Sequence, residues 1–196
     1  MQKTRFALIY VRQLSERKLA DNSRMTNRWK PSATVAAIIE HKGRFLLVEE
    51  HTPEGLRLNN PAGHLDEGED LLSACAREAL EETMHQFTPT HLLGVYMSRF
   101  QRLANAQDAA QDVTYLRFAF CGQLGALQAG RSLDTGIVRT LWLSPDDIRA
   151  SIERHRSPLI LQCMEDYLKG QRFPLSAIHT DASVVSLQSN TTGHTA

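Results

Sequence analysis

The segment from residue 61 to residue 87, PAGHLDEGEDLLSACAREALEETMHQF, constrains the fold more than any other part of the chain. It holds seven carboxylates and a single lysine or arginine side chain, Arg77. Between Asp70 and Thr83, apolar residues stand at helical spacing: Leu72, Ala76, Ala79 and Leu80. This spacing predicts a helix over Asp70–Thr83 that buries one apolar stripe and exposes one charged face. The rest of the chain must supply the surface that covers the stripe.

Apolar, β-prone runs on both sides of this helix predict a mixed sheet. ATVAAIIE and RFLLVEE flank His41-Lys42-Gly43 and predict a hairpin, and residues 56–60 predict a further short strand. After the helix, HLLGVYMS, DVTYLRFAFCGQL and GIVRTLWL predict three more strands, with a polar loop over residues 101–111. Ser144-Pro145 predicts a helix start, and residues 158–169 predict a last helix. This order is typical of an α+β fold without internal repeats.

Composition divides the chain into three parts. A length of 196 residues is that of one domain with tails. Residues 1–30 hold eight basic and two acidic residues without clear periodicity, so we expect a basic N-terminal extension, with Met25 as an alternative start. Residues 31–178 are expected to form the folded domain. Residues 179–196 are polar and are expected to be a disordered tail.

Charge, cysteine content and hydropathy exclude several classes of partner. Lysine and arginine total 22 against 22 acidic residues, so net charge attracts neither nucleic acid nor an anionic membrane. Three widely spaced cysteines predict neither a disulfide framework nor a zinc site, and they fit a reducing cytoplasm. The run FALIYV is too short for a signal sequence, and no run is long enough to span a bilayer. We expect a cytoplasmic monomer or homodimer without a nucleic-acid or membrane partner.

The charged face of the predicted helix is a candidate metal site. Glu78, Glu81 and Glu82 stand at positions i, i+3 and i+4, so their carboxylates repel one another across one face. A hard divalent cation removes this repulsion, and oxygen ligands without histidine or thiolate favour Mg²⁺, with Mn²⁺ as a substitute. Arg77 can pair with Glu81 one turn on or reach back to Glu69. Taken alone, an acidic helix face is more often a solvated surface.

The surrounding spacing decides between these alternatives. Gly63, five residues, Glu69, seven residues and then REALEE over residues 77–82 resemble the Nudix box, the loop–helix–loop signature of hydrolases acting on nucleoside diphosphates linked to another group. The resemblance implies the Nudix fold, a mixed β-sheet sandwiched between helices (α/β/α). It also implies that Glu69 and Arg77 form a structural pair, and that the metal is held by Glu78, Glu81, Glu82 and the carbonyl of Gly63. Catalysis would rest on the three helix glutamates together with Arg77.

Further motifs narrow the resemblance. PAGHL, the preceding VEE, YLRF over residues 115–118, RSPL over residues 156–159 and GQRFPL over residues 170–175 are similar to NudJ-type phosphatases. These bacterial Nudix enzymes act on thiamine-pathway pyrophosphates and on nucleoside tri- and diphosphates. The resemblance implies an Mg²⁺-dependent enzyme that cleaves phosphoanhydride bonds of such small molecules. It places the organic group of the substrate near Glu50, Asn59, Tyr96 and Arg117.

The sequence departs from these patterns at two positions. Leu58 stands where the NudJ-type proteins tend to carry tryptophan, which leaves less ring surface for stacking a purine. Met84 stands where the Nudix box usually closes with a left-handed glycine. Either the helix continues toward Phe87, or it ends in a strained residue at a cost of about 1 kcal/mol.

Several alternatives remain open at this stage. Within the enzymes, the second choice is a nucleotide-pool cleansing hydrolase of the MutT kind, and outside them it is a Nudix fold that only binds ligands. RNA decapping would need a basic surface, which only the N-terminal extension offers. The carboxylate that accepts the proton from water is a glutamate of the box or a loop acid: Asp108, Asp112 or Asp134. For Arg156, a role in starting the last helix is favoured over one in catalysis.

Overall fold

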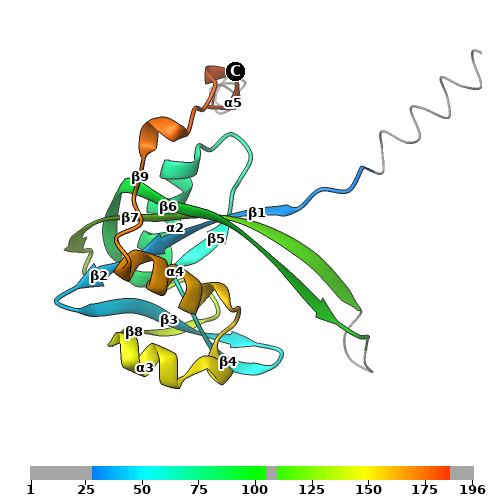
Figure 1. The fold of residues 1–196 in the computed structure, drawn as a ribbon, viewed down its shortest axis with the longest axis vertical. Coiled ribbons are helices and arrows are strands. Elements are labelled where there is room, and N and C mark those ends of the chain that lie inside the picture. Colours follow the sequence, from blue (N-terminus) through cyan, green and yellow to red (C-terminus); the bar gives the residue numbers. More distant parts are fainter. Residues whose placement is uncertain (1–27, 105–109, 186–196) are drawn as a thin grey trace, which may run out of the picture. The chain divides into compact units, whose positions relative to one another are not determined.

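The computed structural model describes residues 28–104 and 110–185, and its folded part consists of two β-sheets with helices packed against them (Figure 1). The interpretations of the basic extension and its alternative start fall almost wholly on residues outside these ranges. Asp108 and most of the expected C-terminal tail lie outside them too. The tail contributes the short helix α5 (Ala182–Val185) to the described part.

The first sheet has five strands in the order β5-β1-β7-β6-β9. β1 runs parallel to β7, and the other neighbours pair antiparallel, so the sheet is mixed as predicted. β6 and β7 form a long hairpin, and residues 95–102 and 111–118 toward its tip are called the arm here. The outer part of the arm, residues 99–102 and 111–114, extends beyond the other strands (Figure 1). The strands are β1 (Ser32–Ile38), β5 (Ala62–His64), β6 (His85–Arg102), β7 (Gln111–Leu127) and β9 (Phe173–Pro174).

The second sheet is built around β3, which pairs with three other strands. The predicted hairpin turns at Lys42 and Gly43, both of which have positive φ angles, 52° and 77°. Glycine adopts such an angle without strain, which explains its place in this tight turn. The strands are β2 (Glu40–His41), β3 (Arg44–Thr52), β4 (Gly55–Asn59) and β8 (Ile137–Leu143).

Side-chain caps stand at the starts of two helices, and the one at Ser144 is the helix start expected from the sequence. The Asp70 carboxylate accepts hydrogen bonds from the backbone N–H groups of Leu72 and Ser73 and starts α2 (Leu71–Thr83). Ser144 and Asp147 form a reciprocal capping box at the start of α3 (Pro145–Ala150). The last predicted helix is α4 (Leu159–Leu168), and short 3₁₀ turns are η1 (Ile152–Arg154) and η2 (Leu175–Ala177).

The end of α2 resolves the question raised by Met84. This residue adopts a left-handed conformation with φ 60°, and its N–H donates to the carbonyl of Leu80. The helix therefore stops at Thr83, and β6 begins at His85, so the alternative of a helix continuing toward Phe87 is wrong. A side chain in this conformation costs about 1 kcal/mol compared with glycine.

Two apolar clusters hold the layers together. One joins α2 to the five-stranded sheet through residues such as Val35, Ala79 and Phe120. The other, on the opposite face of that sheet, joins it to β3 and α4 through residues such as Ala36 and Ile160. The sheet thus lies between helices, which confirms the expected α/β/α arrangement and α+β class.

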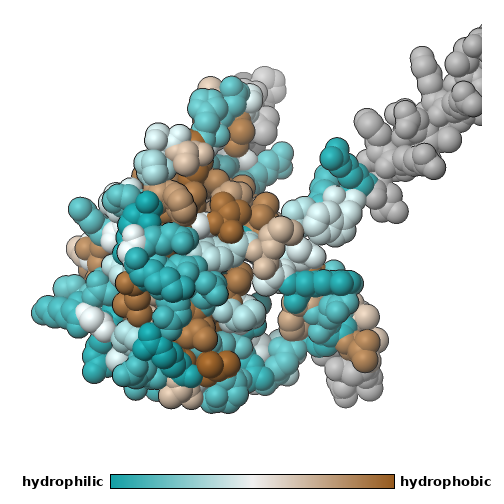
Figure 2. Space-filling view, viewed as in Figure 1, coloured by the Kyte–Doolittle hydropathy of each residue, from teal (hydrophilic) through white to brown (hydrophobic). Residues whose placement is uncertain are grey.

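The surface gives no sign of a membrane span. Within residues 28–104 and 110–185, no helix combines the length and apolar character needed to cross a bilayer. Figure 2 shows mostly hydrophilic residues over β2, β3 and α3 on the face in view, with hydrophobic side chains in smaller groups between them. The three cysteines, Cys75, Cys121 and Cys163, are free and buried.

Candidate active site

The acidic face of α2 meets strand β5 at Gly63. A β-carbon built on Gly63 would lie 2.1 Å from the Cδ and Oε1 atoms of Glu78. The Glu78 carboxylate therefore lies directly against the backbone of β5, where no larger residue fits. The sequence motif brings these two residues together because the loop after β5 is short and α2 packs back onto β1 and β5.

Arg77 is the centre of an ion-pair network on this face. Its Nε and Nη2 atoms donate to the two oxygens of Glu69 at 2.8 and 2.9 Å, a bidentate pair that ties α2 to its entry loop. Its Nη1 atom donates to Glu78 at 2.7 Å and to Glu81 at 3.0 Å. These hydrogen bonds, led by those to Glu69, raise the pKa of Arg77. Both pairings considered for Arg77 from the sequence are thus present, and Glu78 is a third partner.

Glu82 lies deeper than the other two helix glutamates. Its Oε2 atom accepts a hydrogen bond from the backbone N–H of Ala62 at 2.9 Å. Burial raises its pKa to about 8, and the nearby charges of Glu78, Glu50 and Asp134 act in the same direction. Burial also raises the pKa of Glu78. The end of α2 therefore holds more negative charge than its protein surroundings neutralise.

The donor set fits a hard divalent cation. In the described ranges, no three histidine, cysteine or acidic side chains are already grouped for coordination, because Arg77 holds Glu78 and Glu81 while Glu82 is bonded to Ala62. All the candidate donors are nevertheless oxygens, and the Glu82 carboxylate is bonded, among the described residues, to a neutral backbone N–H group and not to a cation. These are the properties of a site for Mg²⁺ or Mn²⁺.

A second polar region lies on the face of the five-stranded sheet opposite α2. Four directly paired residues cross four neighbouring strands of this sheet, and this set is called the polar row. Its members are His64 on β5, Thr34 on β1, Arg117 on β7 and Tyr96 on β6. Directly paired residues point to the same face of a sheet. The polar row continues the line of Ala62, Ala36 and Ala119, which face α4 and β3.

Arg117 is the most unusual member of the polar row. Its side chain belongs to a residue only 9% exposed, and its Nε and Nη1 atoms have no hydrogen-bond partner among the residues that the structure describes. Burial lowers the pKa of Arg117, while the carboxylates of Glu50 and Glu82 counteract this. Burying a guanidinium without partners is costly, so such a group is typical of a site completed by an anionic or hydrogen-bonding ligand.

Glu50 and Asn59 come from the second sheet. Asn59 is opposite Val48, two residues before Glu50, so the register places Asn59 and Glu50 on one face. Both are buried, and Oε1 of Glu50 and Oδ1 of Asn59 have no hydrogen-bond partner within the described part of the chain. The other oxygen of Glu50 accepts a hydrogen bond from Arg156. The sequence favoured a merely helix-starting role for Arg156, and no local signal indicated this contact between residues 106 positions apart.

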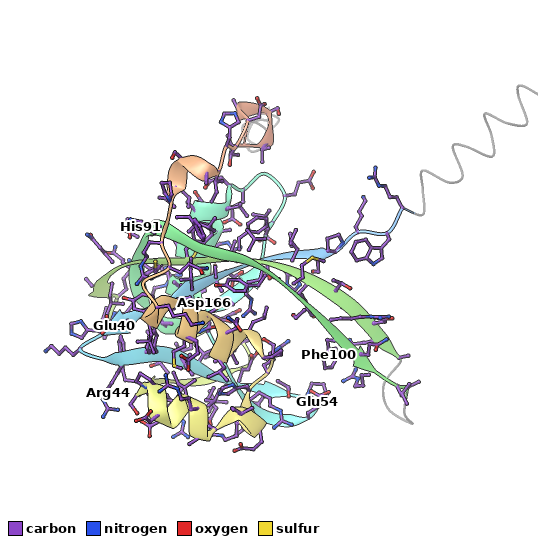
Figure 3. All side chains as sticks on the ribbon, viewed as in Figure 1. Glu40, Arg44, Glu54, His91, Phe100 and Asp166 are labelled. Carbon is purple, nitrogen blue, oxygen red and sulfur yellow. The ribbon has the colours of Figure 1, made fainter. Side chains whose placement is uncertain are left out.

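At two of the positions considered for holding a substrate ring, the side chain is engaged in contacts within the protein. The Tyr96 hydroxyl donates to Asp166 of α4 at 3.2 Å, and its ring lies over Gly94 (Asp166 is labelled in Figure 3). Leu58 is fully buried in the core cluster with Phe45 and offers no surface to a ligand. The Tyr96 side chain is therefore directed toward α4.

The two described loop acids that were proposed as proton acceptors, Asp112 and Asp134, lie in different surroundings. The backbone N–H of Asp134 donates to the carbonyl of Glu81 at 3.0 Å, and its charge acts on Glu82. Asp112 lies on the arm, where its carboxylate accepts two hydrogen bonds from Arg99 at 2.8 and 2.6 Å. Asp134 thus belongs to the surroundings of the helix glutamates, and Asp112 is engaged elsewhere.

Comparison with known proteins identifies the family of this chain. The profile of the NUDIX domain family matches residues 29–163. Phosphatase NudJ from Escherichia coli K12 is 35% identical over 151 residues, covering 76% of this chain and 92% of that protein. A solved NUDIX hydrolase from Nitrosomonas europaea is 48% identical with a TM-score of 0.68, covering 78% of this chain and 98% of that one. A MutT protein structure from Methanosarcina mazei, 21% identical with a TM-score of 0.54, covers 74% and 99% and shares the fold.

Proposed function

This chain belongs to the Nudix family and is a hydrolase of that family, and on this premise we propose that it is an Mg²⁺-dependent pyrophosphohydrolase of small molecules. The observation that carries the proposal is the seating of Glu78 on Gly63 beside Glu81 and Glu82. This arrangement offers oxygen donors from a helix and a backbone carbonyl at one place. In this proposal Mg²⁺ is the metal, and Mn²⁺ substitutes for it.

The proposed ligands of the ion are Glu78, Glu81, Glu82 and the carbonyl of Gly63. When bound, the ion supplies neutralisation of phosphate charge and a lowered pKa for coordinated water. Arg77 and Glu69 hold α2 on its entry loop and so fix the direction of the helix glutamates. Arg77 also contacts Glu78 and Glu81 directly, which makes it part of the proposed catalytic group.

The proposed reaction is hydrolysis of a phosphoanhydride. The oxygen of a water molecule forms a bond to the terminal phosphorus, and the bond from that phosphorus to the bridging oxygen breaks. The rest of the molecule leaves with the bridging oxygen and the electron pair of the broken bond, the attacked phosphorus becomes orthophosphate, and a carboxylate accepts the proton of the water. Glu50, Glu82 and Asp134 are the candidates for this acceptor, because the charges of Glu50 and Asp134 both act on Glu82 at the end of α2.

The proposed substrates are the pyrophosphate of the thiamine pyrimidine, thiamine pyrophosphate, and nucleoside tri- and diphosphates. The similarity to NudJ supports a phosphatase activity. Unpartnered oxygens on Glu50 and Asn59 can accept hydrogen bonds from an aminopyrimidine edge, and the buried Arg117 can donate to a phosphate or a ring acceptor. We place these residues, together with Tyr96 as a supporting wall, around the organic group.

A substrate panel on the purified full chain tests this proposal. We expect hydrolysis that a chelator abolishes and that Mg²⁺ or Mn²⁺ restores, with orthophosphate as product. The kcat/KM for the pyrophosphate of 4-amino-2-methyl-5-hydroxymethylpyrimidine should exceed that for 8-oxo-dGTP. Strong preference for 8-oxo-dGTP with release of pyrophosphate would instead assign the MutT type of reaction. Activity that survives complete metal removal would refute the metal site.

The organisation of the chain is part of the proposal. We propose that residues 31–178 form the catalytic domain, that the protein works in the cytoplasm on small molecules, and that it does so as a monomer or homodimer. A chain that starts at Met25 should keep its melting temperature and its kcat/KM. A large fall in either quantity would show that residues 1–24 contribute to the domain.

A further inference from the structure

An aromatic pair stands beside the buried arginine of the polar row. The rings of His64 and Tyr115 have their centroids 6.3 Å apart at an interplanar angle of 49°. Tyr115 is two residues before Arg117 on β7, and His64 is itself a member of the polar row, so both rings lie on the face opposite α2. His64 is exposed and Tyr115 is half-buried, which leaves ring surface available.

This pair lies where a pyrophosphate bound at α2 would direct its organic group. His64 directly follows Gly63, the residue against which the Glu78 carboxylate lies. From His64 to Arg117 the sheet advances by two strands, a distance of roughly 10 Å. Arg117 is in electrostatic range of Glu82 on one side and neighbours Tyr115 on the other. A molecule reaching from the glutamates across Arg117 therefore meets the Tyr115 ring.

The second sheet borders the same region. Arg102, at the end of the arm, lies 3.5 Å from a carboxylate oxygen of Glu54 in the turn between β3 and β4. Arg102, Phe100 and Ser98 alternate along β6 on the same face as Tyr115, because Ser98 is directly opposite it. In Figure 3 the labelled Phe100 lies on the arm, and the labelled Glu54 lies below it on the β3–β4 turn. The end of the arm thus approaches the β3–β4 turn on the face of β6 and β7 that carries Tyr115.

We infer that Tyr115, supported by His64, is the surface on which the aromatic ring of the substrate stacks, and that it selects ring-bearing pyrophosphates over ring-free ones. The inference rests on the proposed function and deepens it. The two other positions considered for a ring are engaged, since Tyr96 is bonded to Asp166 and Leu58 is in the core. A stacking surface accepts pyrimidines and purines alike, so selectivity among bases should be weak.

Replacement of the Tyr115 ring tests the inference. Tyr115→Leu keeps an apolar side chain but removes the π-face, and Tyr115→Phe keeps the π-face but removes the hydroxyl. With dATP, Tyr115→Leu should lower kcat/KM about 5- to 100-fold, the range for loss of one aromatic stacking partner, while Tyr115→Phe should stay near wild type. With inorganic tripolyphosphate, which has no ring, all three proteins should be equal within about twofold.

Two controls keep the result decisive. Met97→Ala removes an exposed side chain from the opposite face of the arm and should change neither substrate. Equilibrium dialysis in Mg²⁺ with a methylene-bridged dATP analogue and with methylenebisphosphonate repeats the comparison without turnover. Equal losses for the ring-bearing and ring-free molecules, or no loss for either, would overturn the inference. Absence of turnover with intact, Tyr115-dependent analogue binding would refute the proposed function and leave the inference standing.

Discussion

The two faces of the five-stranded sheet differ in how their polar groups are satisfied. On the α2 face, Arg77 donates to Glu69, Glu78 and Glu81, and Asp70 caps the helix. On the opposite face, Arg117 and Thr34 carry buried polar atoms without partners among the described residues. Apart from the proposed metal ligands, the first face is held together by bonds within the chain, whereas polar atoms of the second are left for groups from outside the chain.

Glu49 and Glu50, which are neighbours on β3, also differ in how completely their carboxylate oxygens are bonded. Glu49 accepts hydrogen bonds from Arg139 and Arg154, one on each carboxylate oxygen. Glu50 accepts from Arg156 on one oxygen, and the other oxygen has no partner in the described ranges. Complete bonding marks a residue that holds the fold together, and incomplete bonding marks one that faces a ligand. Substitutions at matched positions test whether this difference in bonding separates structural residues from ligand-binding ones.

The largest effect is expected at the metal face. Glu82→Gln removes a charge from the proposed ligand set and should lower kcat about 100-fold or more, while the fold persists. Glu67→Gln, in the exposed loop before the helix, should leave kcat unchanged. Kinetics at saturating Mg²⁺ with far-UV circular dichroism would check both. Near-normal kcat for Glu82→Gln at saturating metal would remove the helix glutamates from the mechanism.

The opposite face should show a conflict between activity and stability. Arg117→Met should lower kcat/KM about 10- to 100-fold, because charged hydrogen bonds to the substrate are lost. It should also raise the free energy of unfolding by about 1 kcal/mol or more, since an unpartnered buried charge is replaced by an apolar chain. Arg99→Met, on the exposed arm, should change neither quantity. Urea unfolding gives the sign, and a destabilised Arg117→Met would mean that Arg117 is structurally bonded.

Glu49, the fully bonded acid on β3, should make the stability of the fold depend on pH. The hydrogen bond from Arg139 and the charges of Arg139 and Arg154 hold the pKa of Glu49 below its ordinary value of 4.5. The ionised form therefore stabilises the fold above about pH 4.5, and this stabilisation is lost as pH falls through the lowered pKa.

Glu49→Gln should accordingly lower the free energy of unfolding at pH 7 by about 1–2 kcal/mol. We expect less than for a fully buried pair, because the two guanidinium groups remain about half exposed. The difference from wild type should shrink below about pH 4.5. Glu165→Gln breaks a more exposed pair with Arg149 and should have a smaller effect at every pH. A pH-independent loss for Glu49→Gln would point to packing and not to charge.

The smallest effect is expected at the end of α2. Met84→Gly relieves a left-handed side chain and should raise the free energy of unfolding by about 1 kcal/mol. Gln86→Gly, placed in the extended strand β6, should lower it by about 0.5–1 kcal/mol. Thermal unfolding of the two variants against wild type measures the pair of opposite shifts. A destabilised Met84→Gly would show that contacts of the methionine outweigh its backbone strain.

The sequence by itself determined the α2 side of the protein, because the interactions there are local. Glu78, Glu81 and Glu82 share a helix face by spacing alone, and Arg77 reaches Glu69 only eight residues away. The capping signal at Ser144 likewise acts within three residues and located the start of α3. The strands could be predicted from apolar runs, because any sheet would have to bury such runs.

Only the tertiary structure decided the composition of the opposite face. Thr34 meets Arg117 because β1 pairs in parallel with β7, and Glu50 meets Arg156 across 106 positions. Such contacts depend on strand order and register, which no local pattern encodes. The same holds for the aromatic side chains: Tyr96 is bonded to Asp166, whereas the ring of Tyr115 lies beside that of His64. The sequence shows which residues carry a ring, but only packing determines which ring can face a ligand.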